Sequence, residues 1–286
     1  MRSLSATETG DRLNMPLFTH QGIRFHYVDA GGDGVPLVLQ HGLGGDCSQP
    51  AGLFAPASWL RMLCLDCRGH GRTQPLGPAG SLSFNGYADD VIALLDSLII
   101  PSAICGGISM GAGIALNIAL RYPARVRGLI LIRPAWLCEP MPARPWFARI
   151  SALIRENGPE EGLRVLLASP DYADLKRDAP AVARSLADQF AKPGMQETAI
   201  KFERLSADIP YQSAAALRAI GVPTLVIATR RDPVHPYEYG LALANQILHA
   251  RFLEVTAKSI SEQEHQRQIQ IAMENFLQEH FLWPVP

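Results

Sequence analysis

The residues with the clearest capacity for chemistry form the pentapeptide GISMG at positions 107–111, with Ser109 at its centre. A β-rich run, residues 102–106, precedes the pentapeptide, and a helix-like run, residues 112–121, follows it. A tight strand–turn–helix connection holds such a serine in a strained backbone conformation with its hydroxyl exposed. The flanking glycines are needed because larger side chains would collide where strand and helix approach each other. The pattern therefore predicts that Ser109 is a nucleophile, and the competing interpretation is a glycine-rich βα loop without chemistry.

The composition indicates one globular chain without a polyanionic partner. With 286 residues, 48% of them hydrophobic, the chain can bury a full core and carry an inserted subdomain. The formal net charge is −1 and no long charge run occurs, so neither nucleic acid nor a membrane surface is expected as a partner. No apolar run approaches the length of a membrane span. Residues 1–15 lack the apolar segment of a signal peptide, which predicts a flexible tail and a cytoplasmic protein.

The cysteines and histidines do not indicate a metal or redox site. Cys64 and Cys67 match a CxxC pattern, but they lie on an apolar strand with no second pair and no histidine cluster nearby in the sequence. Buried, reduced thiols are therefore predicted. No HExxH segment occurs, and no histidines and carboxylates cluster at ligand spacing. Neither a metal nor another cofactor is expected.

Short β-rich segments alternate with helical ones, which predicts an α/β fold with a mostly parallel sheet covered by helices. The expected strands are 17–20, 23–29, 35–40, 60–66, 102–106, 126–132, 222–228 and 251–256. The expected core helices are 87–98, 112–121, 236–249 and about 261–280.

The alternation of strand-like and helix-like segments stops after Trp136. A proline-rich stretch, residues 139–145, opens a helical region that lasts to about residue 215, and the strand signal returns only at Val222. A helical insertion of this length between two strands is typical of a lid or cap. The predicted division is therefore a core of residues 16–135 and 216–286 with a helical cap of residues 136–215.

Together these features resemble the α/β-hydrolase fold family, specifically its capped, esterase-like branch. The resemblance covers nearly the whole chain from about residue 16 and rests on five markers in order along the sequence. They are His41-Gly42 after the third strand, DCRGHG at 66–71 after the fourth, GISMG after the fifth, Asp232 after the penultimate strand and a histidine near the C terminus. The resemblance implies an eight-stranded, mostly parallel sheet with the cap inserted after the sixth strand, and a Ser–Asp–His order of catalytic residues.

The resemblance implies a histidine base, because the Ser109 hydroxyl at its ordinary pKa is a poor nucleophile. The family places this base in the loop after the last strand, near residue 260, where this chain has Ile260. His265 follows shortly afterwards and shares a helix face with Ile269, so its ring is expected to point inward. His265 is therefore the favoured base. A surface histidine in a polar first turn is the competing interpretation, and His235 is the alternative base.

The resemblance also implies the acid and the donors for a developing oxyanion. Asp232 is expected to orient the base, with a salt bridge to the arginines at 230 and 231 as the competing account. An acid after the preceding strand is used by some relatives, but Arg133 occupies that neighbourhood here. The backbone N–H groups of Leu43 and Met110 are expected to form the oxyanion hole.

Four residues are expected to contact the substrate: His41, Gly42, Trp136 and Trp146. For the two tryptophans, packing of the cap on the core is an equally good account. The resemblance thus implies a serine hydrolase that cleaves a small carboxylic ester or lactone through an acyl-enzyme, without a cofactor. A carbon–carbon bond hydrolase of ring-cleavage products, a perhydrolase and a slow-hydrolysing ligand receptor are the alternatives. The sequence leaves the substrate undetermined and a homodimer open.

Overall fold

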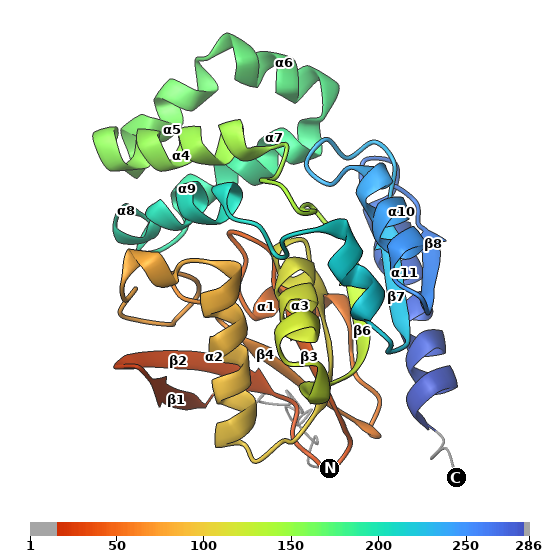
Figure 1. Cartoon of the computed structure of the whole chain (residues 1–286). Helices are drawn as coiled ribbons and strands as arrows, with labels where there is room; N and C mark the ends of the chain where they lie inside the picture. Colours follow the sequence, from red (N-terminus) through yellow and green to blue (C-terminus); the bar gives the residue numbers. More distant parts are fainter. Residues whose placement is uncertain (1–15, 283–286) are drawn as a thin grey trace, which may run out of the picture.

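The computed structural model describes residues 16–282, so the predicted tail at residues 1–15 lies outside the described part. A central sheet of eight strands has the order β1-β2-β4-β3-β5-β6-β7-β8 (Figure 1). β2 is antiparallel to both β1 and β4, and the remaining pairs are parallel. The strands are β1 (Leu17–His20), β2 (Ile23–Asp29), β3 (Val35–Gln40), β4 (Leu60–Leu65), β5 (Ala103–Ile108), β6 (Val126–Ile132), β7 (Thr224–Ala228) and β8 (Ala250–Glu254). The expected eight-stranded, mostly parallel sheet is confirmed.

Two sets of helices complete the fold. The helices of the core are α1 (Ser48–Leu53), α2 (Phe84–Ser97), α3 (Met110–Arg121), α10 (Tyr237–Gln246) and α11 (Glu262–Leu277). The helices inserted between β6 and β7 are α4 (Arg144–Asn157), α5 (Pro159–Leu167), α6 (Pro170–Asp178), α7 (Pro180–Ala187), α8 (Met195–Thr198) and α9 (Ile200–Ala207). Short 3₁₀ segments lie at Ala79–Ser81, Pro123–Arg125, Asp188–Ala191 and Ala214–Ala219, and a π-helical segment, Gln278–Leu282, follows α11. The expected helical insertion after the sixth strand is confirmed, and we keep residues 136–215 as the proposed cap unit.

The central strands are apolar on both faces because both faces are covered by helices. On one face, Val38 of β3 belongs to a buried cluster that includes side chains of α2, α3 and α10. On the other face, Leu37 and Leu39 of the same strand pack with side chains of α1 and α11. The alternation of neighbouring residues between the two clusters follows the period of a β-strand.

The carboxyl ends of the parallel strands carry the residues of interest. β3 leads into the glycine-rich loop 42–45, β5 into Ser109, β6 into Arg133 and β7 into the loop that contains Asp232. Ligands bind at this edge in open α/β sheets. In Figure 1 the inserted helices α4–α9 lie together over one end of the core, and residues of α4, α6 and α7 line the same cavity as these loops.

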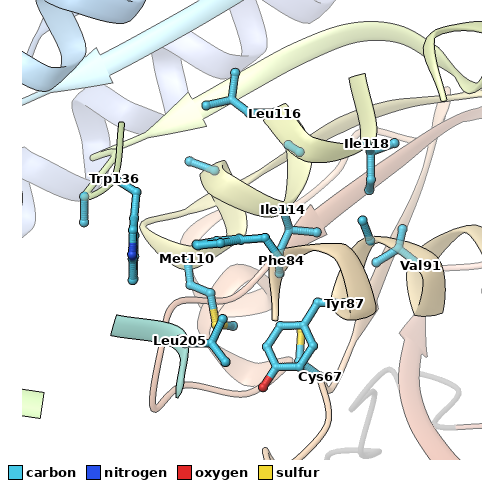
Figure 2. Close-up of a cluster of buried hydrophobic side chains, with 14 of the residues drawn as sticks. Cys67, Phe84, Tyr87, Val91, Met110, Ile114, Leu116, Ile118, Trp136 and Leu205 are labelled. Atoms are coloured by element: carbon cyan, nitrogen blue, oxygen red, sulfur yellow. The ribbon is translucent and has the colours of Figure 1, made fainter. Parts of the chain in front are cut away.

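The proposed cap shares a hydrophobic cluster with the core. Met110, which follows Ser109, belongs to a buried cluster with Phe84 of α2, Trp136 and Leu205 of α9 (Figure 2). The Phe84 and Trp136 rings meet edge to face with centroids 5.2 Å apart. The start of the helix behind the serine is therefore packed against the inserted helices as well as against the core.

Helix α2 begins three residues earlier than the sequence predicted. α2 starts at Phe84 because the Ser83 hydroxyl accepts a hydrogen bond from the Gly86 N–H at 3.1 Å, an N-cap that the apolar spacing alone did not reveal. Among residues 16–282, no helix has the length and apolarity needed to cross a membrane.

Candidate active site

The turn around Ser109 has the strained geometry that the pentapeptide predicts. Ser109 has φ 58°, in the left-handed region that a serine rarely adopts, and lies between β5 and α3. A Cβ on Gly107 would lie 2.6 Å from the Gln40 carbonyl oxygen, and one on Gly111 would lie 2.3 Å from it. Both glycines are thus required by the close approach of β3 to this turn, and the turn holds the hydroxyl at the carboxyl edge of the sheet.

The Ser109 hydroxyl is hydrogen-bonded to a histidine, and that histidine is His235. Its Nε2 lies 3.0 Å from Ser109 Oγ, and its Nδ1 lies 2.9 Å from Asp232 Oδ2. Because a carboxylate accepts, Nδ1 carries the proton and Nε2 is free to accept the serine proton. The three side chains form one hydrogen-bonded chain, the arrangement by which a base activates a nucleophile.

The acid and the base come from a single short loop after β7. Asp232 Oδ1 accepts hydrogen bonds from the Val234 N–H at 3.1 Å and the His235 N–H at 3.2 Å. These bonds close an Asx-type turn that returns the ring of His235 over the carboxylate three residues before it. Arg231, with φ 58°, bends the chain just before this turn, and Pro236 follows the histidine and caps α10.

The prediction that His265 is the base in contact with Ser109 is wrong. Its Nδ1 lies 2.8 Å from the Thr256 carbonyl oxygen, and within residues 16–282 it makes no hydrogen bond to Ser109 or Asp232. The reason is local, because Ser261 caps α11 and the first helical turn ties the imidazole to the strand-end loop. The ring does point inward, as the helical spacing predicted, and it lines the same cavity. The sequence signal for His235 is the close Asp–His spacing in one proline-flanked loop.

Burial favours the neutral form of His235. Burial lowers the pKa of His235, Asp232 raises it and Arg133 lowers it, and the net result is a pKa below the ordinary value. Burial raises the pKa of Asp232, but His235, its hydrogen bond and Arg133 together hold that pKa well below its usual range. At neutral pH the pair is therefore a carboxylate beside an imidazole, which is the protonation state a base requires.

Arg133 is the cation of the site. Its Nε lies 3.7 Å from Asp232 Oδ2 and its Nη2 lies 3.4 Å from His235 Nδ1. The His235 Nδ1 proton is already donated to Asp232, so Nδ1 cannot accept from Arg133. The guanidinium therefore places positive charge beside the ring without a good hydrogen bond to it. The Nε of Arg133 is buried and has no hydrogen-bond partner in the described part of the chain. Arg133 thus acts on this pair through its charge.

The loop after β3 leaves one backbone donor unused. The Gly42 N–H donates to the Gln49 side chain, the Gly44 N–H to His70 Nε2 and the Gly45 N–H to the Gly42 carbonyl oxygen. Within residues 16–282 the Leu43 N–H has no such partner, and the same holds for the Met110 N–H at the start of α3. The two N–H groups predicted to form an oxyanion hole are therefore the ones that the surrounding hydrogen bonds leave available.

A cavity of about 1240 Å³ lies between this edge of the sheet and the inserted helices. Ser109, His235 and Asp232 line it, as do three of the four predicted substrate contacts, Gly42, Trp136 and Trp146. Its wall on the side of the inserted helices is largely apolar, with Met141, Trp146, Phe147, Leu175, Val182 and Leu186. The cavity has room for a small organic molecule beside the serine.

The fourth predicted contact, His41, does not line the cavity. Its side chain is fully buried, Nε2 accepts from the Cys67 N–H at 3.1 Å and Nδ1 donates to the Gly42 carbonyl oxygen at 2.9 Å. Both ring nitrogens are thus used to join the loop after β3 to the loop after β4. The prediction of His41 as a substrate contact is wrong, because backbone groups satisfy the whole ring.

A second group of possible ligand atoms lies away from the serine. His26, Cys47 and Asp66 are buried, and their side-chain donor atoms lie within 4.8 Å of one another. The Asp66 carboxylate already accepts from His26 Nδ1 at 2.7 Å and from the Cys47 N–H at 2.7 Å. The Cys47 thiol donates to the Cys64 carbonyl oxygen at 2.9 Å. These hydrogen bonds give the three side chains a structural role, because they connect β2, β4 and the start of α1.

Comparisons with known proteins agree with this geometry. The family model described as the alpha/beta hydrolase fold matches residues 35–259. The chain is 30% identical over 271 residues to 3-oxoadipate enol-lactonase 2 of Acinetobacter baylyi, covering 91% of this chain and 97% of that protein. It is 29% identical over 251 residues to 2-hydroxymuconate semialdehyde hydrolase of Pseudomonas sp. strain CF600, covering 80% of this chain and 81% of that protein.

Among solved structures, the enol-lactonase from Burkholderia xenovorans LB400 superposes with a TM-score of 0.70 at 27% identity, covering 92% of this chain and 99% of that one. Sheet order, helical insertion, strained serine turn and family match all agree. The chain therefore belongs to the α/β-hydrolase fold family.

Proposed function

We propose that this chain is a serine hydrolase that cleaves a carboxylic ester or lactone through an acyl-enzyme. The observation that carries the proposal is the hydrogen-bonded chain from Ser109 Oγ to His235 at 3.0 Å and from His235 to Asp232 at 2.9 Å. Such a chain provides a nucleophile, a base and a group that orients the base. The similarity to 3-oxoadipate enol-lactonase 2 supports an ester or lactone as the substrate class.

In the first half of the proposed reaction, Ser109 Oγ attacks the carbonyl carbon while its proton moves to His235 Nε2. Asp232 remains ionised and stabilises the imidazolium. The negative charge on the carbonyl oxygen is received by the N–H groups of Leu43 and Met110. The carbon–oxygen bond to the leaving group then breaks, the leaving oxygen takes the proton from Nε2, and the acyl group stays on Ser109.

In the second half, a water molecule attacks the acyl carbon and gives a proton to His235 Nε2. The second tetrahedral intermediate collapses, the bond to Ser109 Oγ breaks, and the serine recovers its proton from His235. For a lactone, the leaving hydroxyl remains attached to the acyl chain, so the single product is a hydroxy acid.

The test is hydrolysis of p-nitrophenyl acetate and butyrate by the wild type and by Ser109→Ala, His235→Ala and His265→Ala. We expect Ser109→Ala and His235→Ala each to lower kcat by about 10⁴-fold or more. The loss of kcat in His265→Ala should be smaller than that in His235→Ala by about 100-fold or more, because the His265 ring makes no hydrogen bond to Ser109 in the described chain. His249→Ala, an exposed histidine before β8, is the matched control and should behave as the wild type.

The opposite order, with His265→Ala inactive and His235→Ala active, would show that the base is His265. A stoichiometric burst of p-nitrophenol without turnover would indicate a slow-hydrolysing receptor. A wild type that turns over no ester at all would overturn the proposed function.

A carbon–carbon bond hydrolase is the second candidate, and the observation that favours it is the similarity to 2-hydroxymuconate semialdehyde hydrolase. Because both reactions use the same catalytic residues, the geometry of Ser109 does not separate them. Turnover of 2-hydroxymuconate semialdehyde beside the ester panel does. Turnover of that compound with no ester hydrolysis would place the second candidate first.

A further inference from the structure

His265 presents an unused hydrogen-bond acceptor. Its Nδ1 lies 2.8 Å from the Thr256 carbonyl oxygen, which can only accept, so Nδ1 carries the ring proton. Burial lowers the pKa of His265, and Arg133 lowers it further, so the ring is neutral at neutral pH. A neutral ring with its proton on Nδ1 has a lone pair on Nε2. Within residues 16–282 that lone pair has no hydrogen-bond partner.

The free nitrogen faces the cavity of the proposed active site. His265 is only 4% exposed, and it lines the cavity that also holds Ser109 and His235. Its Nδ1 side is turned to the loop after β8, and Nε2 is not among the sealed buried atoms that lack a partner. Nε2 is therefore the ring atom open to the cavity. Nε2 can therefore accept a hydrogen bond from a donor group on a molecule bound in the cavity.

Neighbouring cations have other partners and leave Nε2 free. The Lys258 ammonium pairs with Glu262 at 2.8 Å, and the Arg133 guanidinium lies against Asp232 at 3.7 Å. Neither group donates to the His265 ring.

The two walls of the cavity differ in chemistry. The wall on the α11 side carries polar side chains, among them Arg231, Lys258, Ser259 and His265, beside the apolar Ile269. The wall formed by the inserted helices is largely apolar, and the three acidic side chains that α6 adds are paired, Asp171 with Arg149 and both Asp174 and Asp178 with Arg177. A substrate is thus expected to turn its apolar part to the inserted helices and its polar part to α11.

We propose that His265 Nε2 is a substrate-binding acceptor, and that the substrate is an ester or lactone carrying a hydrogen-bond donor, O–H or N–H, on the part that faces α11. This inference rests on the proposed function, since it names the substrate class of that site. A site built to hydrogen-bond a substrate group discriminates strongly against an analogue without it.

The test compares esters that differ only in the donor. The panel is ethyl butyrate with 2-hydroxyethyl, 2-acetamidoethyl and 2-methoxyethyl butyrate, which vary the alcohol side, and ethyl 3-hydroxy-, 3-acetamido- and 3-methoxybutyrate, which vary the acyl side. Each methoxy ester keeps the oxygen of its hydroxy partner but carries a methyl group in place of the proton, so it cannot donate. Acid release is followed at constant pH, and the readout is the ratio of kcat/KM between a donor ester and its methoxy partner.

We expect at least one hydroxy or acetamido ester to exceed its methoxy partner about tenfold or more in the wild type, which is the fold-change of one added hydrogen bond. His265→Phe, which keeps a ring but lacks the acceptor, should bring that ratio to about one. His265→Gln, which offers an amide oxygen, should restore part of it. The donor is identified as O–H if the hydroxy ester has the larger kcat/KM ratio, and as N–H if the acetamido ester does.

Three results would overturn the inference. The first is a wild type whose kcat/KM is no higher for any donor ester than for its methoxy partner, and the second is a preference for the donor ester that survives in His265→Phe. The third is a fall of about 10⁴-fold in kcat/KM of His265→Phe for all esters alike, which would make His265 the base. The first of these needs no variant, so the inference stays testable if His265→Phe does not fold. All three presuppose ester turnover that requires Ser109. Absence of that turnover marks failure of the proposed function instead.

Discussion

At the scale of single residues, Arg133 adds to the effect of burial in keeping the proposed base neutral. Its guanidinium lies beside both Asp232 and His235, and its charge lowers the pKa of each. The base must be neutral to accept the serine proton, so kcat/KM falls as the pH drops through the pKa of His235. Arg133→Met removes a positive charge beside the ring and should raise that pKa. The acidic limb of the kcat/KM profile for p-nitrophenyl butyrate is therefore expected to move to higher pH.

Two further variants separate charge from packing. Arg133→Lys keeps the positive charge and should keep the limb closer to its wild-type position than Arg133→Met does. Arg127→Gln, at an exposed arginine of β6, the strand that leads into Arg133, should leave the profile unchanged. An acidic limb that stays in place in Arg133→Met, or moves to lower pH, would show that the charge of Arg133 does not act on the base.

At the scale of elements, the turn between β5 and α3 depends on the absence of a side chain at Gly111. A Cβ there would lie 2.3 Å from the Gln40 carbonyl oxygen, a backbone atom that cannot rotate away. Gly111→Ala must therefore separate β3 from the turn and displace Ser109 from His235. We expect about a 100-fold loss of kcat, since small displacements of a nucleophile are costly. We also expect a loss of about 1–3 kcal/mol in the free energy of unfolding, measured in urea.

The matched control for this change is Gly80→Ala, because a Cβ on Gly80 meets nothing within 4 Å. Its activity and urea midpoint should match those of the wild type. Wild-type activity in Gly111→Ala would mean that the turn tolerates a wider separation than its packing indicates.

The elements that could be predicted from the sequence are those whose signals are local. The central strands were predictable because they are apolar on both faces, and Ser109 was predictable because two glycines mark the close approach of β3 and the turn. His265 was misassigned because helical spacing tells which face a residue occupies, but not how far its ring lies from Ser109. The contact between His235 and Ser109 depends instead on the bend at Arg231 and on the turn closed by Asp232, which leave only a weak mark in the sequence.

His41 shows a second limit of sequence-based prediction. The same residue type serves for binding a ligand and for joining two loops, and the partners of its ring are the backbone groups of Gly42 and Cys67. Backbone partners leave no residue-specific signal, so only the folded structure distinguishes the two roles. The N–H groups of Leu43 and Met110 could be proposed as oxyanion donors only from the family resemblance, for the same reason.

At the scale of the whole molecule, the inserted helices and the core behave as one packed unit. One buried cluster contains Phe202 and Leu205 of α9 together with Val38 and Met110 of the core. Polar contacts add to it, since the Phe84 N–H donates to Asp208 at 2.7 Å. We therefore expect one cooperative unfolding transition in urea, with coincident midpoints from tryptophan fluorescence, circular dichroism and esterase activity. Two separated transitions would show that the inserted helices unfold independently.

A buried lysine links the inserted helices to the core, and it makes the free energy of unfolding depend on pH. Lys201 of α9 is 3% exposed, and its ammonium donates to the Gly69 carbonyl oxygen of the core at 2.5 Å. Burial, with a smaller effect of Lys192, lowers the pKa of Lys201 to about 7. An unfolded lysine titrates at about 10.4, so between these values the unfolded chain binds more protons than the folded one. This group therefore makes the free energy of unfolding rise with pH, by up to about 1.4 kcal/mol per pH unit.

Lys201→Met removes this contribution while keeping an unbranched side chain. Buried groups with raised pKa values, such as Cys67 and Tyr87, lower stability as the pH rises, but they are present in both proteins. The free energy of unfolding of the wild type minus that of Lys201→Met reports the contribution of the lysine alone. This difference should increase by about 1 kcal/mol per pH unit between about pH 7.5 and 9. Urea titrations at several pH values measure it, with Lys176→Met, an exposed lysine on α6, as the control that keeps the wild-type slope. Parallel stability curves for wild type and Lys201→Met would mean that Lys201 keeps its ordinary proton affinity, and that water reaches the junction of α9 and the loop at Gly69.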